Sequence, residues 1–138
     1  MLRELSIKNF AIIDDLRIRL EGGLTVMSGE TGAGKSIIIN AVNLLLGSRA
    51  SAKLIRTGAD TAELEAFFDI APHSHVAATM LSQGYDPEDG LLVRRLISRS
   101  DRHRVYLNGH MATMQVLNTV TAELASISSQ HAHQGLLK

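Results

Sequence analysis

The stretch Gly29-Glu30-Thr31-Gly32-Ala33-Gly34-Lys35-Ser36 decides the fold, because it matches the pattern G-x-x-x-x-G-K-S at every fixed position. It lies between the apolar run Leu24-Thr25-Val26-Met27 and a second apolar run from Ile37 to Leu46. A short strand, a glycine-rich turn and a helix in this order are typical of a phosphate-binding loop. The glycines let backbone N–H groups point inward around a phosphate, at the positive end of the helix.

The last two residues of this loop add the chemistry that the backbone lacks. Lys35 places a positive charge at the β- and γ-phosphates, and Ser36 offers a hydroxyl ligand for Mg²⁺. We therefore predict that all eight residues from Gly29 to Ser36 bind a nucleoside triphosphate, ATP, together with Mg²⁺. A glycine-rich turn that matches by chance is the alternative, but the flanking apolar runs favour the nucleotide site.

Length and composition restrict the remaining possibilities. A chain of 138 residues suits one domain or part of one. The 14 basic and 14 acidic residues cancel, so any contact with nucleic acid must come from a local patch. The absence of cysteine excludes a disulfide framework and a thiolate zinc site. The charged first residues do not resemble a signal peptide, and no run reaches the length of a membrane span, so we expect a cytoplasmic protein.

Apolar periodicity predicts the secondary structure around the loop. A wide apolar stripe predicts a helix from Gly34 to Leu46, which Gly47 ends. Alternation with a period of two predicts strands, and two further helices follow, the second with Thr113 as its N-cap. The expected strands are Leu2–Asn9, Asp15–Leu20, Thr61–Ile70, Leu91–Ser98 and His103–Leu107; a helical turn within Ala50–Ile55 and helices over Val76–Ser82 and Thr113–Ala125 complete the set. The fold is therefore α/β, with a small antiparallel sheet beside the parallel strand that carries the loop.

Basic residues concentrate around the predicted hairpin of residues 91–107. They are Arg94, Arg95, Arg99, Arg102 and Arg104, together with His103. Alternation sends Arg94 and Arg95 to opposite faces, so the group cannot serve a single surface. We consider DNA contact by Arg99, Arg102 and Arg104, with Lys53 and Arg56 as a second, weaker candidate. The alternative is a solvated hairpin whose charges prevent edge-to-edge pairing.

The order of parts resembles the N-terminal head segment of the SMC-like ATPases. The resemblance is carried by Ile7-Lys8-Asn9-Phe10 at the end of the first strand, by Gly22-Gly23-Leu24-Thr25-Val26, by the phosphate loop and by Asn40-Ala41-Val42. Leu44-Leu45-Leu46-Gly47-Ser48-Arg49-Ala50 and Ser128-Ser129-Gln130-His131-Ala132-His133-Gln134 are most similar to the RecN family of bacterial DNA-repair proteins. The similarity covers essentially the whole chain.

The resemblance implies an ABC-type head that acts in repair of DNA double-strand breaks and in recombination. Two such heads sandwich two ATP molecules, so the expected partners are a second head, the C-terminal half of the same head, and DNA. By match to the family's motifs, Gln130 would be the catalytic glutamine that touches Mg²⁺ or the attacking water. Arg56 would lie near the nucleotide, and Asn108-Gly109 would form a structural turn. A nucleoid-associated location follows.

Motifs that complete such a head are not evident in the sequence. The sequence has no match to an LSGG-type signature, to a Walker B strand that ends in Asp-Glu, or to a switch histidine. Asp69 and the pair Asp14-Asp15 follow apolar residues and only partly resemble the Walker B strand end. We therefore interpret residues 1–138 as the N-terminal half of an ATPase head, without its coiled coil and C-terminal half. Such a chain would bind ATP without efficient hydrolysis.

Two other function classes are alternatives to the ATPase head. One is a self-contained small-molecule kinase, which the two strands before the loop and the absence of an arginine-rich lid helix disfavour. The other is an interaction module in which ATP only holds two partners together. The pairs His73/His75 and His131/His133 are better explained as solvated side chains than as metal ligands, because no cysteine or carboxylate accompanies them.

Overall fold

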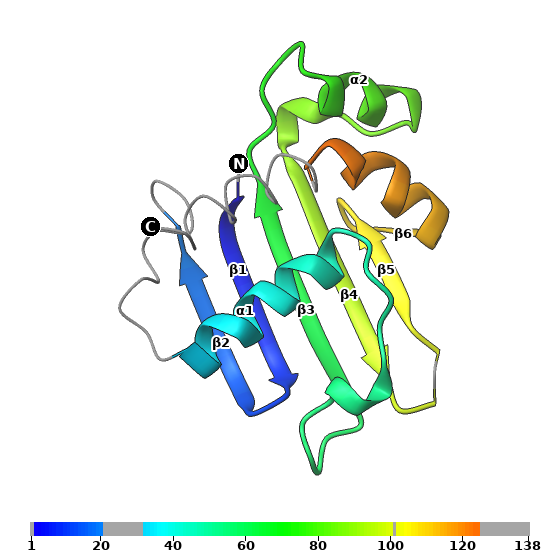
Figure 1. The fold of residues 1–138 in the computed structure, drawn as a ribbon. Coiled ribbons are helices and arrows are strands. Elements are labelled where there is room, and N and C mark those ends of the chain that lie inside the picture. The colour runs from blue at the N-terminus through cyan, green and yellow to red at the C-terminus, as the bar shows by residue number, and fades with distance from the viewer. Residues whose placement is uncertain (1, 21–31, 101, 125–138) are drawn as a thin grey trace.

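A six-stranded antiparallel sheet forms the framework of the computed structural model, which describes residues 2–20, 32–100 and 102–124. The strand order is β2-β1-β3-β4-β5-β6, so the first two strands in the sequence form one edge (Figure 1). The strands are β1 (Leu2–Phe10), β2 (Ile13–Arg19), β3 (Thr61–Phe68), β4 (Leu91–Ser98), β5 (Arg104–Leu107) and β6 (His110–Ala112).

Helix α1 (Gly32–Leu45) covers one face of this sheet. It crosses the strands obliquely from the β2 side and packs against β3 and β4 (Figure 1). A helix at 114–124 packs beside the C-terminal end of α1, where Thr121 Oγ1 lies 2.9 Å from the carbonyl oxygen of Leu46. Helix α2 (His75–Ser82) lies beyond the end of the sheet where β3 finishes, and two 3₁₀ turns, η2 (Ala52–Leu54) and η3 (Pro87–Asp89), complete the described elements.

Alternation along the strands separates a buried face from a half-exposed face. In β3 the residues Ala62, Leu64, Ala66 and Phe68 are buried, while the residues between them are not. Strand β4 repeats this pattern, with Leu91, Val93, Arg95 and Ile97 on the buried side. The buried face is the one that α1 and the helix at 114–124 cover. Polar and mixed side chains on the other face meet no helix among the described residues.

Most of the predicted elements are confirmed, with ends that differ by a few residues. Thr113 caps the last helix as expected, since its Oγ1 accepts from the N–H of Val116 at 3.1 Å. The described sheet is antiparallel throughout, whereas a mixed sheet was predicted. The expected parallel strand over Leu24–Met27 falls in residues 21–31, outside the described residues.

Strand β6 was not predicted, and the Asn108-Gly109 turn explains it. Both residues have positive φ, 50° and 84°, which is the backbone of a two-residue hairpin turn that joins β5 to β6. Asn108 also ties this turn to β4: its Oδ1 accepts from the N–H of Leu92 at 2.7 Å, and its N–H donates to the Leu92 carbonyl oxygen at 2.9 Å. The structural role expected for this turn is thus present.

Replacing Gly90 by alanine should destabilise the sheet. Gly90 precedes β4 with φ at 75°, and an added Cβ would lie 2.6 Å from the Phe67 ring and 2.9 Å from the Phe68 carbonyl oxygen. We expect a loss of about 2–4 kcal/mol in the free energy of unfolding, from backbone strain plus overpacking. Urea unfolding followed by circular dichroism measures it. Gly84→Ala is the matched control, because Gly84 also has positive φ but its Cβ would meet open space; equal losses would contradict the packing argument.

Candidate nucleotide site and surrounding loops

The first turn of α1 carries the two side chains of the predicted loop that are expected to contact phosphate and Mg²⁺. The helix begins at Gly32, inside the motif, and places Lys35 and Ser36 on that turn. Ser36 is exposed and Lys35 is half-buried, and Lys35 forms no salt bridge with any described carboxylate. The N–H groups of a first helical turn have no partner within the helix, and the helix dipole adds positive potential there. This donor set fits a triphosphate with Mg²⁺.

Other residues predicted to bind nucleotide fall outside the described part of the chain. Gly29, Glu30 and Thr31 belong to residues 21–31, and Gln130 belongs to residues 125–138. Their contacts with nucleotide and with Mg²⁺ stay predictions.

Arg56 lies in a loop that backbone contacts tie to the β1–β2 turn. The N–H of Arg56 donates to the Asn9 carbonyl oxygen at 2.8 Å, and the N–H of Ala11 donates to the Leu54 carbonyl oxygen at 2.7 Å. Between these two bonds, Phe10 and Ile55 pair as an isolated β-bridge. The backbone of residues 54–56 is therefore fixed against the end of β1.

The β1–β2 turn adopts an unfavourable backbone to make these contacts. Asn9 and Ala11 have φ values of 54° and 53°, in the left-handed region, while the Phe10 side chain between them is fully buried. A non-glycine residue in this region costs about 1–2 kcal/mol, and such strain persists where surrounding contacts determine the conformation. The buried Phe10 and the bonds to residues 54–56 provide those contacts.

The guanidinium of Arg56 is held far more loosely than its backbone. Its Nη1 lies 3.6 Å from Asp14 Oδ1, and the two side chains are 45% and 76% exposed. Exposed pairs of this kind contribute at most about 1 kcal/mol. The side chain of Arg56 can therefore leave Asp14 for a stronger anion at small cost. Asp14, one of the acidic residues considered for a metal-binding strand end, is the partner of Arg56 in this structure.

Arg99 connects the β4–β5 turn to the loop that contains Arg56. Its Nε donates to the Ala59 carbonyl oxygen at 2.6 Å and its Nη2 to the Arg56 carbonyl oxygen at 3.1 Å. Its backbone N–H donates to the Asp60 carbonyl oxygen at 3.1 Å. The structure thus gives Arg99 an intramolecular role that the sequence analysis did not identify.

The candidate DNA-contact residues lie at one end of the sheet. This basic end consists of Lys53, Arg56, Arg99, Arg102 and Arg104, which come from the connection between α1 and β3 and from the region where β4 turns into β5 (Figure 1). Lys53, Arg102 and Arg104 are all exposed. These residues come from two segments that are far apart in the sequence, and the fold brings the two segments together.

The two neighbouring arginines of β4 point to opposite faces, as alternation predicted. Arg94 faces the helix-free side, where its Nε donates to Glu63 Oε1 at 2.6 Å and its guanidinium lies 5.5 Å from the Tyr106 ring centroid. Arg95 is 2% exposed on the helix-covered side, where its Nη1 donates to the carbonyl oxygens of Leu44 and Ser48 at 2.7 and 2.6 Å. Neither arginine belongs to an exposed patch.

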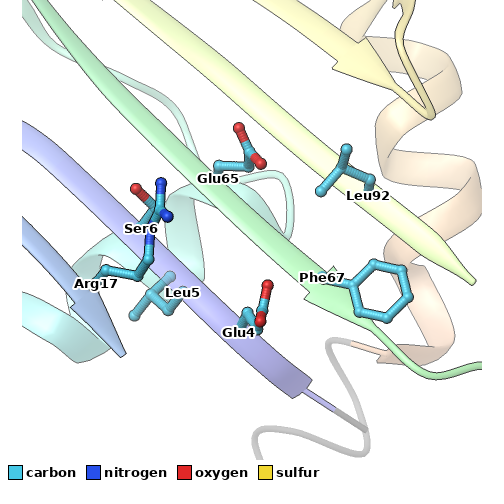
Figure 2. A pocket seen from close by; sticks show the side chains of 7 residues that line it. All are labelled: Glu4, Leu5, Ser6, Arg17, Glu65, Phe67 and Leu92. Carbon is cyan, nitrogen blue, oxygen red and sulfur yellow. The ribbon is translucent and has the colours of Figure 1, made fainter. Parts of the chain in front are cut away.

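A shallow hollow on the helix-free face is not the nucleotide site. Its volume is about 180 Å³, and Figure 2 shows its side chains on neighbouring strands of the sheet. The lining residues are Glu4, Leu5, Ser6, Arg17, Glu65, Phe67 and Leu92. Two carboxylates against one guanidinium do not favour an anion, and α1 lies on the other face of the sheet.

The other acidic candidate has a structural partner. Asp69 lies just after β3 and accepts from Arg3 Nε at 2.5 Å. Within residues 2–20, 32–100 and 102–124, no three histidine or acidic side chains gather into a group that could hold a metal ion. None of the helices in these ranges is long and apolar enough to cross a membrane.

Comparison with known proteins shows the family to which this chain is similar. Residues 4–119 match a family model described as an AAA domain. The chain is 44% identical over 138 residues to the DNA repair protein RecN of Halalkalibacterium halodurans and 45% identical over 139 residues to that of Bacillus subtilis. These alignments cover 99% and 100% of this chain but only 24% of each relative, so the chain spans about a quarter of their length.

Solved structures with a similar fold are SMC ATPase heads. One, from work on ATP-driven dimerization and DNA-stimulated activation of SMC ATPases, has a TM-score of 0.66 and 27% identity over 89% of this chain and 79% of its own. An SMC head bound to the C-terminal winged-helix domain of ScpA has a TM-score of 0.64 and 25% identity over 86% of this chain and 39% of its own. The recombination mediator RecF, at 13% identity and a TM-score of 0.61, shares the fold.

Replacing Arg99 by alanine should loosen the loop that holds Arg56. The change removes two side-chain bonds to backbone carbonyls at an exposed site, so we expect a loss of about 1 kcal/mol in the free energy of unfolding. Arg102→Ala is the control, because Arg102 lies three residues away and is also exposed; its loss should stay below about 0.5 kcal/mol. Urea denaturation of the two variants measures the difference, and indistinguishable midpoints would remove the bridging role of Arg99.

Proposed function

The chain belongs to the AAA domain family, and we propose that it is the N-terminal, nucleotide-binding segment of a RecN-like SMC-type ATPase that acts in repair of DNA double-strand breaks and in recombination. It would work with the C-terminal half of the same head and with a second head, near the nucleoid. The observation that carries this proposal is the start of α1 within the motif, with an available Lys35 and an exposed Ser36 on its first turn.

Charge distribution at the start of α1 supports ATP with Mg²⁺ as the ligand. The ammonium group of Lys35 balances part of the triphosphate charge, and the hydroxyl of Ser36 is an oxygen ligand of the kind that Mg²⁺ prefers. A bound metal ion would neutralise charge on the phosphates during transfer. The backbone N–H groups from residue 32 onward would complete the anion site through the helix dipole.

Arg56 and Gln130 are proposed as further contacts to the reacting groups. The backbone of Arg56 is fixed by the β1–β2 turn while its guanidinium pairs only weakly with Asp14, which suits a residue that must exchange one anion for another. Gln130 would orient Mg²⁺ or the attacking water. Phosphoryl transfer also needs acidic and signature groups that a second segment must supply, so hydrolysis would require the C-terminal half and a second head.

The basic end offers a surface for the DNA backbone. Lys53, Arg102 and Arg104 are exposed and lie with Arg56 and Arg99 at one end of the sheet. The net charge of the chain is zero, so attraction to DNA would depend on this local concentration of positive charge. Contacts of this kind bind phosphates regardless of sequence. The location at the Arg56 loop would place DNA close to a residue assigned to the nucleotide.

Replacing Lys35 by alanine tests nucleotide binding directly. The change removes the charge at the phosphates, so we expect ATP affinity to fall at least tenfold, a loss of more than about 1.4 kcal/mol. Titration with a fluorescent ATP analogue in Mg²⁺ measures it. Lys8→Ala is the control, since Lys8 is a half-buried lysine on β1. Unchanged affinity in Lys35→Ala would refute the assignment of the phosphate loop.

Neutralising the basic end should weaken DNA binding in a salt-dependent way. In the triple variant Lys53→Gln, Arg102→Gln, Arg104→Gln, each lost phosphate contact should make the negative slope of log affinity against log salt shallower by about 0.9. Fluorescence anisotropy of a short DNA duplex across a salt series gives the slope. The double variant Arg17→Gln, Arg19→Gln, on β2, tests general loss of positive charge. The same slope for the triple variant and the parent would mean that DNA does not use this surface.

A further inference from the structure

The C-terminal end of α1 is held by side chains from two different elements. Arg95 of β4 donates from Nη1 to the carbonyl oxygens of Leu44 and Ser48, at 2.7 and 2.6 Å. Thr121, from the helix at 114–124, places its Oγ1 2.9 Å from the carbonyl oxygen of Leu46. A helix end leaves its last carbonyl groups without partners in the helix. Side chains from the sheet and from a second helix thus contact three carbonyl oxygens within residues 44–48, of which that of Leu44 also accepts from the N–H of Gly47 at 3.2 Å.

We propose that Arg95 and Thr121 are positioning residues for the nucleotide, because they fix α1 from its far end and so place the phosphate-binding turn at its start. The proposal rests on the proposed function, and it assigns to these two residues a role that neither the motif nor the comparisons indicate. Neither residue touches the nucleotide. Each acts through the helix.

Burial along α1 shows why its far end determines its placement. Ile38, Ala41, Val42, Leu44 and Leu45 are at most 5% exposed, and all of them except Ile38 lie in the second half of the helix. Lys35 is half-buried and Ser36 is exposed, so these two residues are less buried than those in the second half of the helix. A helix of 14 residues is a rod of about 21 Å at 1.5 Å per residue. Rotation or sliding at the anchored end is therefore transmitted to the phosphate-binding end.

Arg95 is better suited to fixing a position than to adding stability. Its side chain is 2% exposed, its Nε–H has no acceptor among the described residues, and no described carboxylate pairs with it. Burial lowers the pKa of the Arg95 guanidinium below its ordinary value, because desolvation penalises the charged form. Such an unpaired buried charge is costly, and apolar residues often replace buried charges without loss of stability. Bonds from one nitrogen to two carbonyls do define the position of the helix end, and the positive charge suits the negative end of the dipole.

Thr121 fixes the same helix end from the other side. Its hydroxyl is fully buried and lies 2.8 Å from the Leu117 carbonyl oxygen as well as 2.9 Å from that of Leu46. Gly47 lies at this contact, where an added Cβ would lie 2.1 Å from Oδ1 of the exposed Asn118 side chain, which would have to move. The positive φ of Gly47, 116°, favours glycine in the turn where the helix at 114–124 packs on the end of α1. Contacts from β4 and from this helix together oppose movement of α1 along or about its axis.

Loss of these contacts should appear as weaker nucleotide binding rather than only as lower stability. If α1 populates several positions, only the fraction with the correct geometry binds, and the apparent affinity falls by that fraction. A tenfold weaker affinity would mean that about one molecule in ten holds the correct position.

The test measures the affinity of this chain for a fluorescent ATP analogue in the variants Arg95→Met, Arg95→Lys, Thr121→Val and Thr121→Ser. Circular dichroism establishes the temperature at which each variant is fully folded, and binding is measured there. The chain offers two matched controls. Arg94→Met removes the neighbouring guanidinium on the opposite face, and Thr119→Val removes an exposed hydroxyl that bonds only within its own helix, to the Gln115 carbonyl oxygen.

We expect Arg95→Met to bind about tenfold more weakly and Thr121→Val about threefold more weakly than the parent. Arg95→Lys and Thr121→Ser should recover most of the affinity, because the ammonium and the hydroxyl can still donate to the carbonyls. Parent-like affinity in folded Arg95→Met and Thr121→Val would overturn the proposal and leave these contacts purely structural. If Arg95→Met does not fold, Thr121→Val and its serine rescue decide. Failure of the parent itself to bind would instead refute the proposed function, which is a distinct outcome.

Discussion

The burial of α1 against one face of the antiparallel sheet is the constraint on which the rest of the structure depends. A phosphate-binding loop can hold a triphosphate only if the helix behind it stays in place, and α1 has no covalent link to the sheet near its packing surface. Its apolar stripe supplies the adhesion, since each fully buried aliphatic side chain contributes about 1.5–3 kcal/mol. Apolar packing alone, however, does not fix the orientation of α1 on the sheet, because it is not directional. The polar contacts of Arg95 and Thr121 fix the position of α1 along and about its axis, which apolar packing does not.

The same sheet organises a second region at the end where β1 turns into β2. There the chain accepts two left-handed residues, Asn9 and Ala11, so that Phe10 can enter the core and the backbone can bond to residues 54–56. Arg99 then joins this loop to the end of β4. Strain in one turn and a bridging arginine in another thus produce a rigid support for Arg56. The backbone is fixed while the guanidinium is held only by a weak pair with Asp14, which suits the nucleotide contact that we propose for Arg56.

Sequence reasoning succeeded where the relevant interactions are local. The stripe of α1, the alternation of β3 and the cap at Thr113 all depend on neighbours within a few residues, and the structure contains the elements they predict. It failed where the interaction is distant in sequence. The roles of Arg95 and Arg99 depend on carbonyls 40 to 51 residues away, and the order of the strands depends on pairings that no periodicity encodes. The three-residue strand β6 is too short to show a period, although Asn108-Gly109 is a strong hairpin signal.

The arginines of β4 and the loops that follow it show how burial decides which charges can respond to a ligand. Arg95 is buried on two carbonyls, so its position is set by the fold and it cannot reach solvent. Arg94 is half-exposed but engaged by Glu63 and Tyr106. Arg99 donates hydrogen bonds to two backbone carbonyls, while Arg102 lies exposed at the same end of the sheet. The basic cluster of the sequence therefore divides into arginines that bond within the fold and arginines that remain available to an anion. A neutral chain can then present positive charge at one end, because Lys53, Arg102 and Arg104 are exposed there and none of them forms a salt bridge with a described carboxylate.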